Sequence, residues 1–254
     1  MNLAQKISII GSGWLGLPLA LHLRQKGHAI HISTTTPKKL PLLSQQGLTP
    51  YLLPISTDPL PKDHPLFQTD ILIVTLPFKR TFSNPKDYTH QFQSILNALP
   101  SPSPWIIMTS STSAHKTPPG ARELALQDTE NLVLGTNNAT ILRLGGLYGA
   151  TRQIGKFLSG KSDIPDGPAN LIHLDDVIGI IDALIDTPQK NQLFSVVSDT
   201  HPLKSQLYTK AAQKMGLAPP TFLPALADIL PISNTAIKTA LQYKFIHPNP
   251  MEDI

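Results

Sequence analysis

Apolar positions along the first hundred residues alternate between short continuous runs and longer stretches with helical spacing. Lys6–Ile10 is a short apolar run that ends at a glycine, and the periodic stretch after it continues to Lys26. Asp70–Leu76 (DILIVTL) and Trp105–Thr109 (WIIMT) are nearly continuous apolar runs, which are typical of strands buried on both faces of a parallel sheet. This alternation predicts an α/β protein with a Rossmann-type, doubly wound parallel sheet.

Weaker patterns extend the same alternation. His28–Ile32 is predicted as the second strand and Tyr51–Ile55 as the third, and a helix is expected from about Tyr88 to Leu99. Pro50 and Pro54 flank and interrupt the third strand. Because proline cannot donate to a sheet ladder, this strand belongs at an edge, which is its place in the strand order 3-2-1-4-5-6.

We predict a division into two parts. Residues 1–150 form an NAD(P)-binding Rossmann domain that is completed by about residues 171–198, and residues 151–170 and 199–254 form a small substrate-binding lobe. In the second half we expect a helix over Leu203–Gly216 and another that runs through Leu184, with Asp175 or Asp176 as its N-terminal cap.

Composition excludes several classes of protein. The net charge is +4, but Lys and Arg form no block longer than Lys38-Lys39, which argues against a nucleic-acid partner. No window approaches the roughly 18 apolar residues of a membrane span, and glycines interrupt the first apolar stretch, so we expect a cytoplasmic protein without a membrane partner. The chain has no cysteine and its nine histidines are dispersed, so no metal site is predicted. The oligomeric state stays open, with a dimer among the alternatives.

The glycine pattern after the first strand predicts a dinucleotide site. A GxGxxG turn between a strand and a helix lets the backbone approach a pyrophosphate, which then faces the N–H groups of the helix N-terminus. The alternative is a glycine-bearing turn in another α/β fold. The predicted cofactor contacts in this turn are Gly11, Ser12, Gly13, Trp14, Leu15 and Gly16.

The end of the second strand bears on the choice of cofactor. NAD-preferring folds commonly carry an acid about 20 residues after the glycines, but Ser33 holds that position, and no Asp or Glu occurs between Gly27 and Pro50. Hydroxyls followed by lysines suit a 2′-phosphate, so we predict NADP(H), with NAD(H), or a solvated turn that selects neither, as alternatives. The contacts predicted here are Ser33, Thr34, Thr35 and Lys38, and those at the ends of the fourth and fifth strands are Thr75, Leu76, Pro77 and Thr109.

Four segments in sequence order resemble the extended short-chain dehydrogenases, which include nucleotide-sugar epimerases and dehydratases. These segments are IIGSGWLG, MTSSTSAH, ILRLGGLYG and LIHLDDVIGII. Within that family the chain is most similar to the YeeZ-like group, and the resemblance covers nearly all of it. It implies the Rossmann fold, a nicotinamide cofactor and a substrate-orienting Ser or Thr after the fifth strand, which matches Ser111.

One part of the family pattern is missing. Most such enzymes carry a Tyr-x-x-x-Lys pair, whose lysine lies one helical turn from the tyrosine and lowers its pKa. None of the five tyrosines here has lysine four residues later, and the matching positions hold Arg122 and Leu126. The YeeZ-like group also departs from the pair. Any proton transfer therefore needs another group, and His115, just past Ser111, is the predicted candidate.

The combined prediction is an atypical NADP(H)-dependent oxidoreductase of the epimerase/dehydratase-like type that acts on a small anionic substrate. Ser111 and His115 are the predicted catalytic residues, and the alternatives are a strand-end serine without chemistry and a solvated histidine. Arg152, Lys156 and Lys161 suit an anionic ligand, or serve only as solubilising charges. A function from another class stays open, in which a catalytically silent dinucleotide-binding protein reports the cofactor state to a partner.

Overall fold

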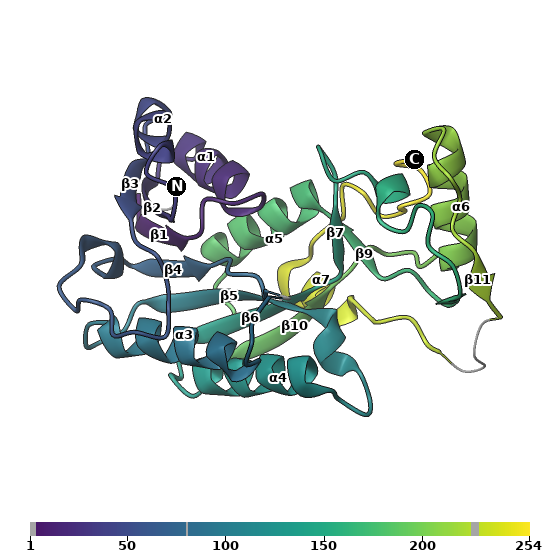
Figure 1. The fold of residues 1–254 in the computed structure, drawn as a ribbon. Coiled ribbons are helices and arrows are strands. Elements are labelled where there is room, and N and C mark those ends of the chain that lie inside the picture. Colours follow the sequence, from purple (N-terminus) through teal and green to yellow (C-terminus); the bar gives the residue numbers. More distant parts are fainter. Residues whose placement is uncertain (1–3, 80, 225–228) are drawn as a thin grey trace. The chain divides into compact units, whose positions relative to one another are not determined.

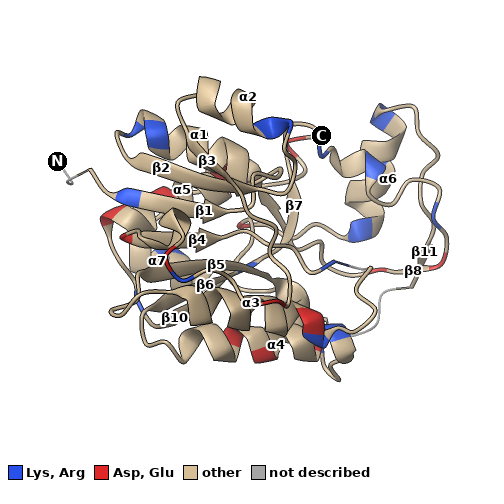
Figure 2. Ribbon diagram, turned by 60° about the vertical axis from the view of Figure 1, so that its left-hand side comes forward, with Lys and Arg blue, Asp and Glu red and all other residues tan. Residues whose placement is uncertain are grey.

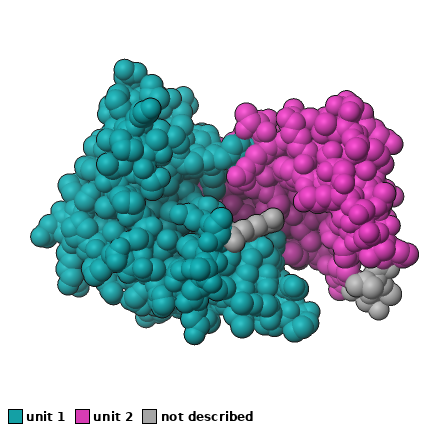
Figure 3. Space-filling model, in the orientation of Figure 1, with its two compact units in different colours: residues 1–143, 186–194 teal, residues 144–185, 195–254 magenta. Residues whose placement is uncertain are grey.

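The computed structural model describes residues 4–79, 81–224 and 229–254 (Figure 1). The chain divides into two compact units, one of residues 1–143 and 186–194 and the other of residues 144–185 and 195–254 (Figure 3). The segment 171–198, predicted to complete the Rossmann domain, is shared between the two units. Residues 225–228 of the predicted lobe lie outside the described residues.

A seven-stranded sheet has the order β10-β6-β5-β4-β1-β2-β3, which confirms the predicted Rossmann-type architecture. The pairings of β1 with β2 and β4, of β2 with β3 and of β4 with β5 are parallel. The third strand lies at the edge, as predicted, but it comprises Thr49–Leu52 and not Tyr51–Ile55, so Pro50 lies within it and Pro54 beyond its end. The strands are β1 (Lys6–Ile10), β2 (Ala29–Thr34), β3 (Thr49–Leu52), β4 (Ile71–Val74), β5 (Trp105–Ser111), β6 (Ala139–Leu144) and β10 (Gln192–Val196).

Helices connect these strands because the segments between them repeat their apolar residues every three or four positions. The first unit contains α1 (Gly16–Gln25), α2 (Lys39–Gln45), α3 (Lys86–Ala98) and α4 (Ala121–Leu134), with short 3₁₀ turns η1 (Pro65–Phe67) and η2 (Thr112–His115). Helices α3 and α4 run side by side along one face of the sheet (Figure 1). Tyr88 and Phe92 of α3 share a buried cluster with Leu126 of α4 and with Ile106 and Met108 of β5.

The second unit contains two small parallel strand pairs. They are β7 (Gly146–Tyr148) with β9 (Leu171–His173), and β8 (Ile164–Pro165) with β11 (Phe222–Leu223). The other elements are η3 (Ile154–Lys156), α5 (Leu174–Asp186), α6 (Lys204–Lys214) and α7 (Thr235–Leu241). Gly155 of η3 allows close packing on α6, because a Cβ there would lie 2.6 Å from the carbonyl oxygen of Ala211.

The start of α5 differs from the prediction. The Asp176 carboxylate does not serve as the helix cap but accepts hydrogen bonds from the amides of Ile246 and His247, at 2.7 and 3.0 Å, and from the Tyr243 hydroxyl at 3.2 Å. The amide of Asp175 donates to Nδ1 of His173 at 3.2 Å. Asp176 therefore holds the C-terminal segment against the start of α5, a role that requires contacts about 70 residues apart.

Charged residues are spread over many elements. Lys and Arg occur on separate helices and loops, and the lysines of α6 are spaced along its length (Figure 2). Among the helices of the described residues, none is both long and apolar enough to cross a bilayer.

Candidate functional site

In the turn between β1 and α1, two of the three motif glycines have no room for a side chain, and one faces open space. Gly11 has a φ of +106°, a conformation that favours glycine, and a Cβ on Gly16 would lie only 1.8 Å from the carbonyl oxygen of Gly11. At Gly13, by contrast, an added Cβ would meet no described heavy atom within 4 Å. The first and third glycines of the motif are therefore required by packing, and the second leaves space beside the backbone where a ligand can approach.

Side chains from neighbouring strands hold this turn in place. The Ser33 hydroxyl accepts a hydrogen bond from the amide of Gly11 at 2.9 Å, and the Thr75 hydroxyl donates to the carbonyl oxygen of Ile10 at 3.0 Å. The Lys39 ammonium reaches the carbonyl oxygen of Ser12 at 3.3 Å. Trp14 and Leu15, also predicted as cofactor contacts, follow in the turn, where Trp14 is half-buried and Leu15 buried. The predicted residues Ser33 and Thr75 are thus part of the turn's own support.

The end of β2 presents hydroxyls and positive charge. Ser33 and Thr34 are buried, and the Thr34 hydroxyl accepts from the amide of Thr36 at 3.2 Å. Thr35 and Lys38 are exposed immediately beyond them. The exposed part of this segment therefore offers groups that can donate hydrogen bonds to an anion.

The ends of β4 and β5 are tied to the sheet. The Thr109 hydroxyl donates to the carbonyl oxygen of Val74 at 3.3 Å, and the carbonyl oxygen of Leu76 accepts from the Tyr88 hydroxyl at 3.2 Å. Pro77 follows as an exposed residue. Burial raises the pKa of the Tyr88 phenol, so this tyrosine stays protonated and has no part in acid–base work near neutrality.

Ser111 caps the 3₁₀ turn after β5. Its hydroxyl oxygen accepts from the amide of Ser113 at 3.2 Å and from the Ser113 hydroxyl at 3.0 Å. Both bonds use the oxygen's lone pairs, so the Ser111 proton is the group left to donate to an external oxygen. That polarity matches a residue that orients a carbonyl or hydroxyl.

A buried ion pair lies beneath this serine-rich loop. The Glu130 carboxylate, 1% exposed, accepts from Nε and Nη2 of Arg143 at 3.0 and 2.5 Å and from the Ser110 hydroxyl. Such a paired arrangement compensates two charges that would otherwise be costly to bury. Nothing in the local sequence around Glu130 indicates this pair, because its partner Arg143 lies on β6.

The same arginine orients His115. Nη1 of Arg143 lies 3.2 Å from Nδ1 of His115. Because a guanidinium can only donate, Nδ1 must accept, and the neutral ring carries its proton on Nε2. Burial and the Arg143 charge lower the pKa of His115, against the opposing effect of Glu130. His115 is therefore uncharged at neutral pH and suits hydrogen-bond donation through Nε2 better than proton abstraction.

The helix positions that match the family's missing pair have other roles. Leu126 is 1% exposed and belongs to the core cluster of the first unit. The Arg122 guanidinium lies 5.7 Å from the centre of the Phe78 ring, in a cation–π arrangement. A lysine at 126 would bring its charge into an apolar core, so the fold itself excludes the usual pair at this place.

The second unit has a pocket of about 440 Å³. Arg152, one of the three predicted anion-binding residues, lines it together with Tyr148, His173 and Lys214, whereas Lys156 and Lys161 are exposed elsewhere in the same unit. The Tyr148 hydroxyl donates to Oδ2 of Asp253. Burial and this carboxylate raise the pKa of Tyr148, which keeps the phenol protonated.

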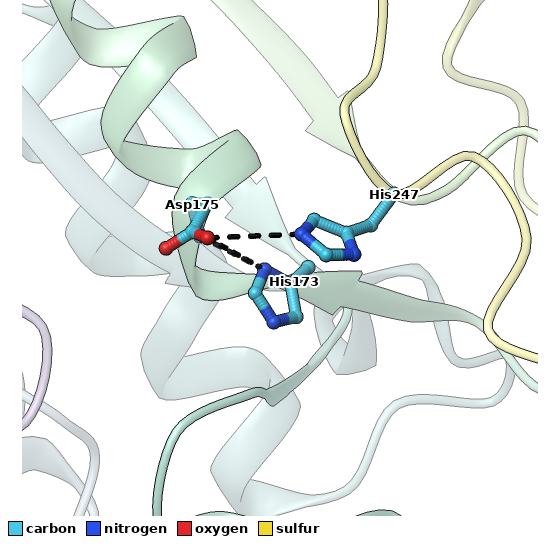
Figure 4. Close-up of side chains that lie close together, drawn as sticks. All are labelled: His173, Asp175 and His247. Atoms are coloured by element: carbon cyan, nitrogen blue, oxygen red, sulfur yellow. Dashed lines mark hydrogen bonds and ion pairs between the residues drawn. The ribbon is translucent and has the colours of Figure 1, made fainter. Parts of the chain in front are cut away.

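Beside this pocket, three side chains from distant parts of the chain converge (Figure 4). His173 lies at the end of β9, Asp175 in the first turn of α5 and His247 in the C-terminal segment. The two imidazole rings have centroids 3.6 Å apart. His173 and His247 are 74 positions apart in the sequence, and this wide spacing predicted no histidine cluster. In the fold their rings are neighbours.

Comparisons with known proteins agree with this architecture. No family model matches the chain. Protein YeeZ of Escherichia coli is 31% identical over 97% of this chain and 98% of its own length. A short-chain dehydrogenase/reductase superfamily protein from Agrobacterium tumefaciens with bound NAD has a TM-score of 0.74 at 15% identity, over 98% of this chain and 95% of that one. A UDP-glucose-4-epimerase from Stenotrophomonas maltophila with bound NAD has the same TM-score at 13% identity and the same coverage.

The two structural matches share the fold, and the sequence match extends over almost the full length of both proteins. The GxGxxG turn and the strand order are those of the Rossmann fold that the sequence resemblance implies. The chain therefore belongs to the YeeZ family, and it shares its fold with a short-chain dehydrogenase/reductase superfamily protein and with a UDP-glucose-4-epimerase.

Proposed function

We propose that this protein binds a nicotinamide dinucleotide at the Gly11–Gly16 turn and works as an epimerase/dehydratase-like oxidoreductase. The observation that carries the proposal is the combination of a tightly packed Gly11 and Gly16 with open space at Gly13. This is a cradle into which a pyrophosphate fits and which a side chain would fill. When bound, the cofactor would supply hydride transfer.

NADP(H) is the proposed preference, supported by the exposed Thr35 and Lys38 and by the lack of an acid in this segment. Calorimetric titration of the purified protein with NADPH, NADH and their oxidised forms tests it. Replacement of Lys38 by glutamate is expected to weaken NADPH binding about tenfold, through loss of a charge-assisted hydrogen bond, and to leave NADH binding unchanged. The exposed Lys190→Glu variant is the matched control. Equal loss for both cofactors, or none, would contradict the 2′-phosphate assignment.

The proposed substrate is a small anion. Arg152 and Lys214 in the pocket of the second unit supply positive charge, and Tyr148 and His173 add hydrogen-bonding groups. A guanidinium can bind a carboxylate or phosphate through two parallel bonds, so an arginine favours such a group over a neutral sugar. A screen of carboxylated and phosphorylated carbonyl compounds with NADPH therefore comes before one of neutral substrates.

In this proposal Ser111 orients the reacting oxygen through its hydroxyl proton, and His115 adds a second donor through Nε2. Neither residue removes a proton as the family's tyrosine does. A reaction that needs only polarisation of a carbonyl and a proton from water fits these groups better than abstraction from a sugar hydroxyl.

Replacement of Ser111 by alanine is expected to lower kcat by about 10²–10³, the range for loss of one donor to a reacting oxygen. It should also lower the free energy of unfolding by about 1 kcal/mol, because Ser111 caps η2. The Ser113→Ala variant removes one bond of the same turn without the proposed substrate contact, so it should keep its turnover. Steady-state kinetics and urea unfolding of both variants separate the two effects. Full turnover in Ser111→Ala would end the Ser111 assignment.

The packing of Leu126 favours a second function, a dinucleotide-binding sensor without catalysis. Such a protein binds NADPH but shows no hydride exchange with any compound of the screen. Its sedimentation, alone or with a candidate partner, changes when the cofactor binds. Turnover of any substrate would show that the protein is an enzyme and would rule out the non-catalytic sensor.

A further inference from the structure

We infer that His173, Asp175 and His247 form a binding site for a divalent transition-metal ion, of which Zn²⁺ fits best. The inference does not rest on the proposed dinucleotide chemistry, because all three residues belong to the second unit. Two imidazoles and one carboxylate are ligands that zinc commonly uses, whereas Ca²⁺ and Mg²⁺ prefer oxygen ligands alone.

The spacing of the ligand atoms is close to that of a metal site. Oδ2 of Asp175 lies 3.6 Å from Nδ1 of His173 and 3.7 Å from Nε2 of His247, and one ligand atom from each residue lies within 4.8 Å of the others. A tetrahedral ion with bonds of about 2.1 Å holds its ligand atoms about 3.4 Å apart. Small side-chain rotations therefore close the site, and the dashed lines of Figure 4 run from the carboxylate to each of the two rings, which lie together on one side of it.

His247 is oriented for coordination by its other ring nitrogen. Nδ1 of His247 lies 2.8 Å from Oδ1 of Asp253. A carboxylate in that position holds the proton on Nδ1 and directs the Nε2 lone pair toward Asp175, an arrangement that metal-binding histidines usually show. The second oxygen of Asp253 accepts from the Tyr148 hydroxyl, and the amide of His247 donates to the buried Asp176. Both the ring and the backbone of His247 are thus fixed.

Solvent can reach the three ligands, and they leave one coordination position for a ligand from outside the protein, as in sites that exchange their metal ion. The Asp175 side chain is 56% exposed, so an ion can enter from solvent. Coordination by Nδ1 of His173 replaces its 3.2 Å hydrogen bond from the amide of Asp175, and since Asp175 is exposed, water can take the place of Nδ1 at that amide. Three protein ligands leave a fourth position for water or another ligand.

An alternative is that the same cluster holds the C-terminal segment without any ion. The two cases differ in what Asp253 does. In a metal site it is a positioning residue, whose loss lowers metal affinity although it never touches the ion. In a metal-free cluster there is no affinity to lower.

The test uses the full-length protein after removal of metals with a chelator, titrated with zinc chloride by calorimetry and with Co²⁺ by visible absorption. We expect one equivalent of Zn²⁺ to bind and Co²⁺ to give the intense bands of tetrahedral coordination. Asp175→Asn and His247→Ala should each weaken Zn²⁺ binding at least 100-fold, and Asp253→Asn should weaken it about 10- to 100-fold. The exposed His90→Ala on α3 is the control and should bind as the unchanged protein does.

The inference is overturned by absence of stoichiometric Zn²⁺ binding in the unchanged protein, and equally by binding that survives Asp175→Asn and His247→Ala. Should His247→Ala fail to fold, the exposed Asp175→Asn still decides, together with the Co²⁺ spectrum of the unchanged protein. Weak bands of six-coordinate Co²⁺ would count against the site. Mg²⁺ at the same concentration should not compete.

Discussion

Replacement of Glu130 by glutamine is expected to lower the free energy of unfolding by about 3–5 kcal/mol, the usual loss when one partner of a buried ion pair is removed. Glu130 is 1% exposed and binds both Arg143 and the Ser110 hydroxyl. The glutamine amide keeps only one acceptor oxygen, and its NH₂ group faces a guanidinium that also donates. Arg143 then stays largely buried without a counter-charge.

Urea unfolding followed by circular dichroism measures this loss as a lower midpoint at unchanged slope. The control is Lys238→Met, which breaks the exposed pair of Lys238 with Asp199, at 2.8 Å, and should cost about 0–1 kcal/mol. The double variant Glu130→Leu/Arg143→Met removes both charges and should be more stable than Glu130→Gln alone. A loss below about 1 kcal/mol for Glu130→Gln would show that Arg143 finds other compensation.

Replacement of Gly16 by alanine is expected to destabilise the protein by about 1–3 kcal/mol and to abolish dinucleotide binding. The new Cβ would lie 1.8 Å from the carbonyl oxygen of Gly11 and 3.0 Å from the Thr75 hydroxyl. The first of these is a backbone atom, so the turn itself must shift. Alanine favours a helix over glycine by about 1 kcal/mol, so any net loss comes from the close contact and not from helix propensity.

Gly13→Ala is the matched variant for this experiment. A Cβ at Gly13 meets no described heavy atom within 4 Å, so the variant should unfold within about 0.5 kcal/mol of the unchanged protein. It should nevertheless bind NADPH at least tenfold more weakly, because the methyl group occupies the space proposed for the pyrophosphate. Calorimetry and urea unfolding of both variants separate folding from binding. Unaltered binding by Gly13→Ala would contradict the proposed position of the cofactor, whatever Gly16→Ala shows.

The elements of the first unit were predictable because their signals are local. Strand β4 is buried at every residue, and the continuous apolar run from Asp70 to Leu76 predicts this directly. The helix expected from about Tyr88 to Leu99 extends over Lys86–Ala98. The edge position of β3 agrees with Pro50 inside it, since a residue without an N–H group cannot complete the hydrogen bonding of an inner strand.

Side-chain roles were less predictable, because a polar residue at a given position can bind several different partners. Asp176 looked like a helix cap in the sequence, but its carboxylate binds the amides of Ile246 and His247. Ser33, predicted to contact the cofactor, also accepts from the amide of Gly11. The ordinary pKa of histidine predicts a proton carrier at His115, but the neighbouring Arg143 determines which of its ring nitrogens carries the proton.

The succession of strands and helices along the first unit, the glycine turn and the lack of a Tyr-x-x-x-Lys pair can be read from the amino-acid sequence, because each depends on spacing within a few residues. Contacts between groups that are far apart in the chain are seen in the folded structure alone. Glu130 pairs with Arg143 across 13 positions, and His247 lies beside His173 and Asp175 from the far end of the chain. These contacts depend on the path of the backbone between the two residues, and the local pattern of apolar and polar residues does not predict that path.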